Sequence, residues 1–186
     1  MRKRASMAHR FRFESLPRWV GAPLRFMPPL LLGRALSQLA IRLRQAHPEL
    51  MERMGPYANV TFLIDPTDLP VVFRVRPGNS RPVACFSRLA PAACDARIAA
   101  PLAVLLAMIQ GTLDGDALFF SRDIDIEGDT EAVLALRNAI DSIECDFASE
   151  CAAQWGPLRP LAENAARGAL RLLEYQSGVT LLRPAA

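Results

Sequence analysis

The sequence predicts an α+β fold, in which a mostly antiparallel sheet of about five strands is covered on one face by helices. Three observations support this class. Five short segments carry the apolar pattern of strands, most of the links between them are of hairpin length, and stretches with helical apolar stripes flank them. At 186 residues, the chain is long enough for one domain with its own core.

The predicted strands follow one another through the middle of the chain. The turn-rich sequence PTDLP separates the first two, and Pro77-Gly78 followed by Asn79 and Ser80 predicts a hairpin between the second and third. The five segments are 60–65, 71–76, 81–87, 95–99 and 124–127.

The stretch from Leu118 to Phe147 combines a strand, a turn and a helix. Apolar and acidic residues alternate up to Glu127, as in a strand with one buried face. Gly128 breaks the alternation, and Asp129 is placed to cap the N-terminus of a helix. The helix is predicted from an apolar stripe at steps of three and four: Val133, Leu136, Ile140, Ile143 and Phe147.

Three further helices are expected. The segment 30–46 has a leucine stripe and is followed by Pro48, 102–110 begins after Pro101, and 161–175 carries Leu161, Ala165 and Leu172 on one side. We therefore divide the chain into an N-terminal segment (1–48), a central domain (49–147) and a C-terminal helical extension (148–186).

The composition points to a soluble or peripheral protein. About half of the residues are hydrophobic, yet the longest uncharged apolar runs are about half the length that spans a bilayer. Four cysteines lack C-x-x-C or paired spacing and are interpreted as reduced, mostly buried thiols. They are Cys85, Cys94, Cys145 and Cys151.

Positive charge is concentrated at the N-terminus. Residues 1–44 contain ten Arg or Lys side chains and one acidic residue, whereas the whole chain has a net charge of +3. The rest of the chain is therefore net acidic, which favours a basic segment that meets an anionic surface. Residues 1–15 suit a disordered basic arm, and a mitochondrial presequence stays open. The membrane-contact candidates within the Pro-rich stretch that follows are Arg18, Trp19, Arg25 and Phe26.

Motifs for catalysis are missing from the sequence. It has two histidines and contains no nucleophile elbow, P-loop or dinucleotide-binding glycine motif. Asp123, Asp125, Glu127 and Gly128 match part of a calcium loop, but its twelfth position is Leu134 instead of Glu, so we expect no metal or other cofactor. Nucleic-acid binding is disfavoured because few aromatic residues accompany the basic ones. A lipid-modifying enzyme that uses a carboxylate base stays an alternative.

The run LFFSRDIDIEGDTE, residues 118–131, resembles the motif that closes the lipid-binding domain of the sterol carrier protein type two superfamily. Within it, the run is most similar to the UbiT type of ubiquinone-biosynthesis accessory factor. The resemblance implies a non-catalytic, hydrophobic tunnel for prenylated quinone precursors, which are presented to hydroxylating UbiU- and UbiV-like partners of the oxygen-independent pathway. A general phospholipid carrier is the alternative.

The apolar residues exceed what a thin core of sheet and helices requires. Together with the resemblance to the lipid-binding domain, these residues predict a hydrophobic cavity between the two layers, lined by few polar groups. The expected lipid-binding residues are Phe62, Ile64, Val72, Phe86, Leu102, Leu105, Ile109, Phe119, Phe120 and Ile124. Such a protein would work in the cytoplasm, peripherally attached to the inner membrane.

Overall fold

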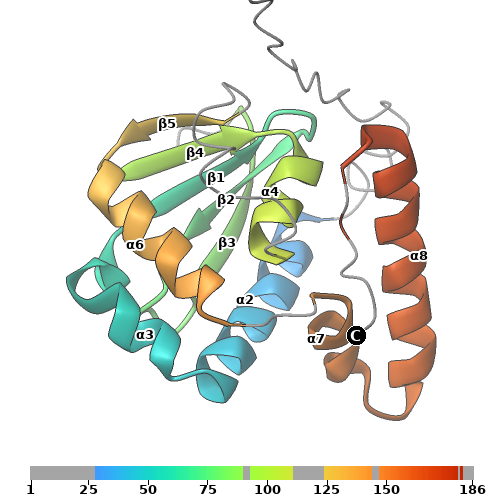
Figure 1. Ribbon diagram of the computed structural model, residues 1–186. Helices are drawn as coiled ribbons and strands as arrows, with labels where there is room; N and C mark the ends of the chain where they lie inside the picture. Colours follow the sequence, from blue (N-terminus) through green and yellow to red (C-terminus); the bar gives the residue numbers. More distant parts are fainter. Residues whose placement is uncertain (1–27, 90–92, 111–123, 144–146, 180, 182–186) are drawn as a thin grey trace, which may run out of the picture.

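The computed structural model describes residues 28–89, 93–110, 124–143, 147–179 and 181, apart from the side chains of 147, 148, 151, 154 and 155. In this part of the chain, helices lie in front of a five-stranded sheet, and a long C-terminal helix lies to one side (Figure 1). The predicted α+β class is thereby confirmed.

The sheet contains all five predicted strands. They are β1 (Phe62–Pro66), β2 (Val71–Val75), β3 (Val83–Ser87), β4 (Ala96–Ala100) and β5 (Asp125–Gly128), in the order β3-β2-β1-β4-β5. Three neighbouring pairs are antiparallel, as predicted. The pair β1–β4 is parallel, which makes the sheet mixed, because β4 returns to the far side of β1 after the β2–β3 hairpin.

The helices are α2 (Pro29–Ala46), α3 (Glu49–Met54), α4 (Leu102–Gln110), α6 (Thr130–Asp141), α7 (Phe147–Ala152) and α8 (Arg159–Ser177), with 3₁₀ turns η1 (Gly55–Asn59) and η2 (Ala153–Leu158). The sequence did not predict α3, α7 or the 3₁₀ turns. Helix α6 also ends at Asp141, before the last two members of the predicted stripe.

The junction of β5 and α6 has the predicted geometry. Gly128 has φ +84°, and a Cβ there would lie 2.2 Å from the carbonyl oxygen of Asp95, so a larger residue is excluded without a shift of β4. Asp129 caps α6, because its Oδ1 accepts a hydrogen bond from the backbone N–H of Ala132 at 3.0 Å. Both expectations are confirmed.

The main core lies between one face of the sheet and helices α3, α4 and α6. Phe62 of β1 and Val104 of α4 are fully buried there, together with Met54 and Val133. The other face of helix α4 is apolar as well and packs in a second cluster. In that cluster, Ala107 of α4 and Leu170 of α8 are both buried. The buried side chain of Gln110 ties the two parts together by donating to the carbonyl of Leu181.

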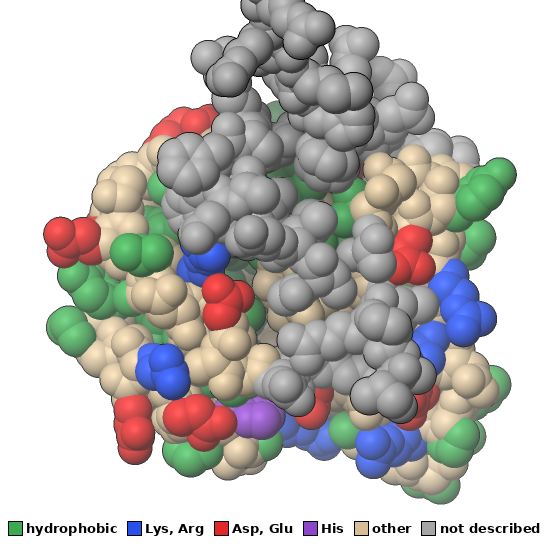
Figure 2. Space-filling model, in the orientation of Figure 1, with side chains coloured by type: hydrophobic (Ala, Val, Ile, Leu, Met, Phe, Trp, Pro, Cys, Tyr) green, Lys and Arg blue, Asp and Glu red, His purple; other side chains and the backbone are tan. Residues whose placement is uncertain are grey.

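Helix α8 buries a different face from the one that its sequence pattern emphasises. Leu170 and Ser177 are buried, whereas Leu161, Leu172 and Tyr175 are 69%, 60% and 88% exposed. Apolar side chains are accordingly visible along the outer edge of the molecule, over α8 (Figure 2). The inner face of α8, with Leu170 and the partly buried Ala166 and Leu173, packs against the second cluster instead.

Candidate functional site

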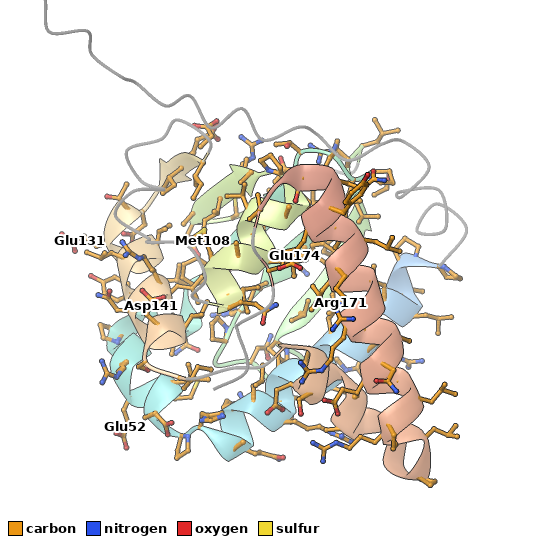
Figure 3. All side chains as sticks on the ribbon, turned by 45° about the vertical axis from the view of Figure 1, so that its right-hand side comes forward. Glu52, Met108, Glu131, Asp141, Arg171 and Glu174 are labelled. Carbon is orange, nitrogen blue, oxygen red and sulfur yellow. The ribbon has the colours of Figure 1, made fainter. Side chains whose placement is uncertain are left out.

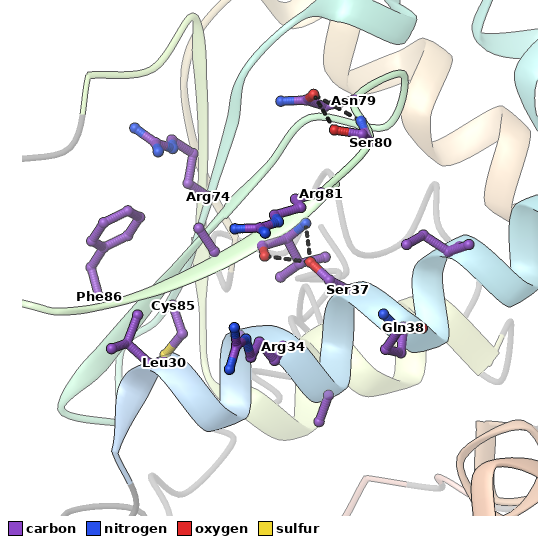
Figure 4. Close-up of a pocket in the computed structure, with 15 residues that line it drawn as sticks. Leu30, Arg34, Ser37, Gln38, Arg74, Asn79, Ser80, Arg81, Cys85 and Phe86 are labelled. Atoms are coloured by element: carbon purple, nitrogen blue, oxygen red, sulfur yellow. Dashed lines mark hydrogen bonds between the residues drawn. The ribbon is translucent and has the colours of Figure 1, made fainter.

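A cleft of about 1010 Å³ lies between α2 and the β2–β3 hairpin (Figure 4). One wall is a face of α2 that includes Leu30, Arg34 and Ile41, and the other is formed by β3 with the turn before it. The cleft is therefore built at the outer edge of the sheet, on the strand farthest from β5.

Contacts along the whole length of the cleft hold α2 against β3 and the hairpin turn. Gly33 lets the helix approach closely, since a Cβ there would lie 2.9 Å from the backbone nitrogen of Cys85. Ser37 Oγ donates to the carbonyl of Val83 at 2.6 Å and accepts from its N–H at 3.0 Å. Near the end of the helix, Arg44 donates to the carbonyls of Pro77 and Asn79 in the hairpin turn.

The cleft has an apolar end and a polar end. Leu30 and Phe86 lie at one end, and Asn79 and Ser80 lie at the other (Figure 4). Three arginines line the space, Arg34 from α2, Arg74 from β2 and Arg81 from the residues before β3. The guanidinium of Arg74 stacks over the Phe86 ring at 4.9 Å from its centre. No Asp or Glu belongs to the described lining.

Cys85 lines the cleft from β3 and is a free, buried thiol. Burial raises the pKa of this thiol, because a thiolate is poorly solvated there. Cys85 therefore contributes a neutral, weakly polar surface and not a nucleophile. Cys94 is also free, but it is exposed, so the expectation of free thiols is confirmed for these two and the expectation of burial for Cys85 alone.

A separate ionic cluster lies on the face of the sheet opposite the main core. Asp65 is buried and lies 2.6 Å from Arg97 Nη2 and 2.7 Å from Arg88 Nη2. Arg97 also reaches Glu127 at 2.8 Å, and the hydrogen bond to Asp65 raises the pKa of Arg97. Both oxygens of the buried carboxylate are thus engaged in charge pairs, which favours a structural role for Asp65 over that of a free catalytic base.

The predicted lipid-binding residues are distributed over several places. Phe62 and Leu105 belong to the main core, and Ile64 and Ile124 pack against it partly buried. Leu102 and Ile109 of α4 are half-buried. Val72 and Phe86 are paired across strands β2 and β3, on the opposite face of the sheet from Phe62, since side chains alternate along a strand.

Of that set, Phe86 alone is among the described lining of the cleft. Phe119 and Phe120 lie outside the described residues, as do the membrane-contact candidates Arg18, Trp19, Arg25 and Phe26. A tunnel lined by the other members stays a prediction.

The arginines of the cleft were not among the residues predicted from the sequence. Arg34, Arg74 and Arg81 are separated by up to 47 positions and share no motif. One signal was present, because the alternation in VVFRVR puts Val72 and Arg74 on one face and Phe73 on the other.

Within the described ranges, no group of three or more His, Cys, Asp or Glu side chains is placed to hold a metal ion, and Asp123 of the partial calcium motif lies outside them. None of the helices that the structure describes is both long enough and apolar enough to cross a bilayer.

Together, the mixed sheet, its helical cover and the cleft of mixed polarity define a small α+β domain with a cleft at one edge of its sheet. The model of the SCP-2 sterol transfer family matches residues 40–141, which is more than half of the chain. The protein therefore belongs to the SCP-2 sterol transfer family, and its central part is a lipid-binding domain of that kind.

Solved structures with the same fold include the UbiJ-SCP2 ubiquinone synthesis protein. It is 18% identical, with a TM-score of 0.50, and the match covers 62% of this chain and 94% of that one. Sterol carrier protein 2 from Yarrowia lipolytica, in its apo form, is 12% identical over 62% of this chain and 91% of that chain, with a TM-score of 0.43. A comparison with curated protein sequences gives no match.

Proposed function

We propose that this protein binds a polyprenylated intermediate of ubiquinone synthesis and holds it, without reacting with it, for partner enzymes. The observation that carries the proposal is the cleft between α2 and the β2–β3 hairpin. Its volume of about 1010 Å³ lies at the upper end of the usual range for small-molecule sites, roughly 300–1000 Å³. The apolar side chains at one end of the cleft and the polar ones at the other match a molecule with a hydrophobic tail and a polar ring.

The physical need for such a carrier follows from the size of the tail. Each CH₂ group removed from water contributes about 0.8 kcal/mol, so a long prenyl chain is insoluble unless a membrane or a protein encloses it. Membership of the SCP-2 sterol transfer family supports a lipid as the ligand. A link to ubiquinone is supported by the motif at residues 118–131 and by the name of the UbiJ-SCP2 ubiquinone synthesis protein.

The partners that we propose are UbiU- and UbiV-like hydroxylating proteins of the oxygen-independent pathway, as expected of a protein of the UbiT type. The proposed place of action is the cytoplasmic surface of the inner membrane. The excess of basic residues before residue 45 supports this location, since each Arg or Lys near an anionic surface contributes about 1 kcal/mol.

Mass spectrometry of lipids extracted from the folded, full-length protein tests this function. We expect a prenylated quinone precursor at close to one molecule per protein. Extraction of phospholipid alone would favour a general carrier instead. An extract without lipid above the level of a matched, unrelated protein would contradict the proposal as a whole.

A further inference from the structure

The cleft contains an unbalanced group of positive charges. Arg34, Arg74 and Arg81 line it without a carboxylate among the described lining residues. Some other arginines of the described chain do pair with acids: Arg88 and Arg97 with Asp65, and Arg167 with Glu163. Among the described residues, none forms an ion pair with the three arginines of the cleft.

The neighbouring polar groups already have partners. Ser37 is hydrogen-bonded to both backbone groups of Val83. Asn79 Oδ1 accepts from the backbone N–H of Ser80 at 2.8 Å, and Arg44 holds the carbonyl of Asn79. These contacts fix the hairpin wall of the cleft, but they do not neutralise the guanidinium groups.

The three arginines also come from separate elements that meet only in the folded chain. Arg74 is oriented by its stacking on Phe86, which places a cation next to the apolar end of the cleft. Guanidinium groups bind carboxylate and phosphate oxygens in a bidentate fashion, and one anion near several cations relieves their mutual repulsion.

We propose that Arg34, Arg74 and Arg81 form a headgroup site, and that the cleft selects an amphiphile whose polar end is a carboxylate or a phosphate. The apolar end beside Phe86 and Leu30 would receive the first part of the chain of that molecule. This inference rests on the proposed lipid-binding function and adds the charge of the ligand to it.

Calorimetric titration of the full-length protein tests the site with four probes: oleate, lysophosphatidic acid with the same chain, neutral monoolein and inorganic phosphate. The variants are Arg34→Gln, Arg74→Gln and Arg81→Gln. Arg171→Gln is the control, because Arg171 projects from α8 and loses the same charge outside the cleft (Figure 3). Melting curves establish that each variant is folded.

We expect the wild type to bind the two anionic lipids more tightly than monoolein. Each cleft variant should weaken binding of the anionic lipids by about tenfold or more, the factor for losing a charge-assisted hydrogen bond, and leave monoolein unchanged. Arg171→Gln should behave like the wild type. If a Gln variant does not fold, the matching Lys variant keeps the charge, and its affinity is expected to fall less.

Three other results would overturn the inference in distinguishable ways. Equal affinity for monoolein and oleate, unaffected by the variants, would remove the headgroup site but leave lipid binding intact. Phosphate that binds as tightly as lysophosphatidic acid and competes with it would make the site one for a free anion. Failure of every lipid to bind would contradict lipid carriage by the cleft and the headgroup site together.

Discussion

Asp129 and Phe62 stabilise the same half of the core by different means. Asp129 provides one hydrogen bond to the first turn of α6, on the surface. Phe62 has a fully buried ring between β1 and the helices. A lost cap bond can be replaced in part by water, whereas a lost ring leaves a cavity whose surroundings relax only partly.

We therefore expect Asp129→Ala to lower the free energy of unfolding by about 1 kcal/mol, and Phe62→Ala by about 3–5 kcal/mol. Urea denaturation followed by circular dichroism measures both values. The lipid extracted from Asp129→Ala should be the same as that from the wild type. An unchanged melting curve together with lost quinone synthesis in cells would instead give Asp129 a role in chemistry or partner binding.

Single residues also mark the limit of what the sequence predicts. The cap at Asp129 and the turn at Gly128 were predictable because each depends on neighbours within a few positions. The arginines of the cleft were not predictable, because they come from α2, β2 and the residues before β3. Val72 and Phe62 lie on opposite faces because the register pairs Phe62 with Val75, and the hydrophobicity of the two strands does not fix that register.

Among the elements, the pairing of α2 with β3 depends on Ser37. Its hydroxyl is buried and satisfies both the N–H and the carbonyl of Val83. Ser37→Ala should lower the free energy of unfolding by about 1–3 kcal/mol, because two backbone groups then lose their hydrogen-bond partner in a partly buried interface.

Urea denaturation measures this cost, and hydrogen exchange locates it, because the Val83 amide should exchange faster in the variant. Gln45→Ala is the matched control, as Gln45 is an exposed residue of the same helix and its loss should change stability by less than about 0.5 kcal/mol. Equal stability of Ser37→Ala and the wild type would mean that water replaces the hydroxyl and that α2 is held by other contacts.

Elements were predictable where a local pattern was long enough. All five strands and helices α2, α4, α6 and α8 follow from periodicity, with shifts of a residue or two at most of their ends. Helix α3, with six residues, is too short to show a stripe. The parallel β1–β4 pair was missed because strands that follow each other in sequence usually pair. Here the β2–β3 hairpin separates β1 from β4 along the chain.

For the whole molecule, the uneven charge leads to a prediction on membrane binding. Deleting residues 1–27 removes most of the basic residues before residue 45 but keeps α2 and Pro28, whose carbonyl accepts from Leu31. The shortened protein should keep its fold and bind anionic vesicles more weakly. Salt should weaken binding of the full chain, because it screens exposed charges.

Vesicle sedimentation at two salt concentrations provides the measurement, with neutral vesicles as the control for non-electrostatic binding. Equal sedimentation of the full and shortened chains with anionic vesicles would show that residues 1–27 are not the membrane contact. The exposed apolar face of α8 would then be the next surface to test, by Leu172→Ser.

The position of α2 has a last consequence, for the behaviour of the protein in concentrated solution. A bare outer strand presents unpaired backbone groups to which a strand of another molecule can add. Here α2 covers β3 through Gly33 and Ser37, while the strand at the other edge, β5, carries exposed Asp125 and Glu127. One border of the sheet is thus shielded by a helix, and the other is protected by exposed charged side chains, of which Glu127 is paired with Arg97. A lipid that entered the cleft by displacing α2 would open the first border, so self-association would accompany loading unless a partner protein occupied the strand.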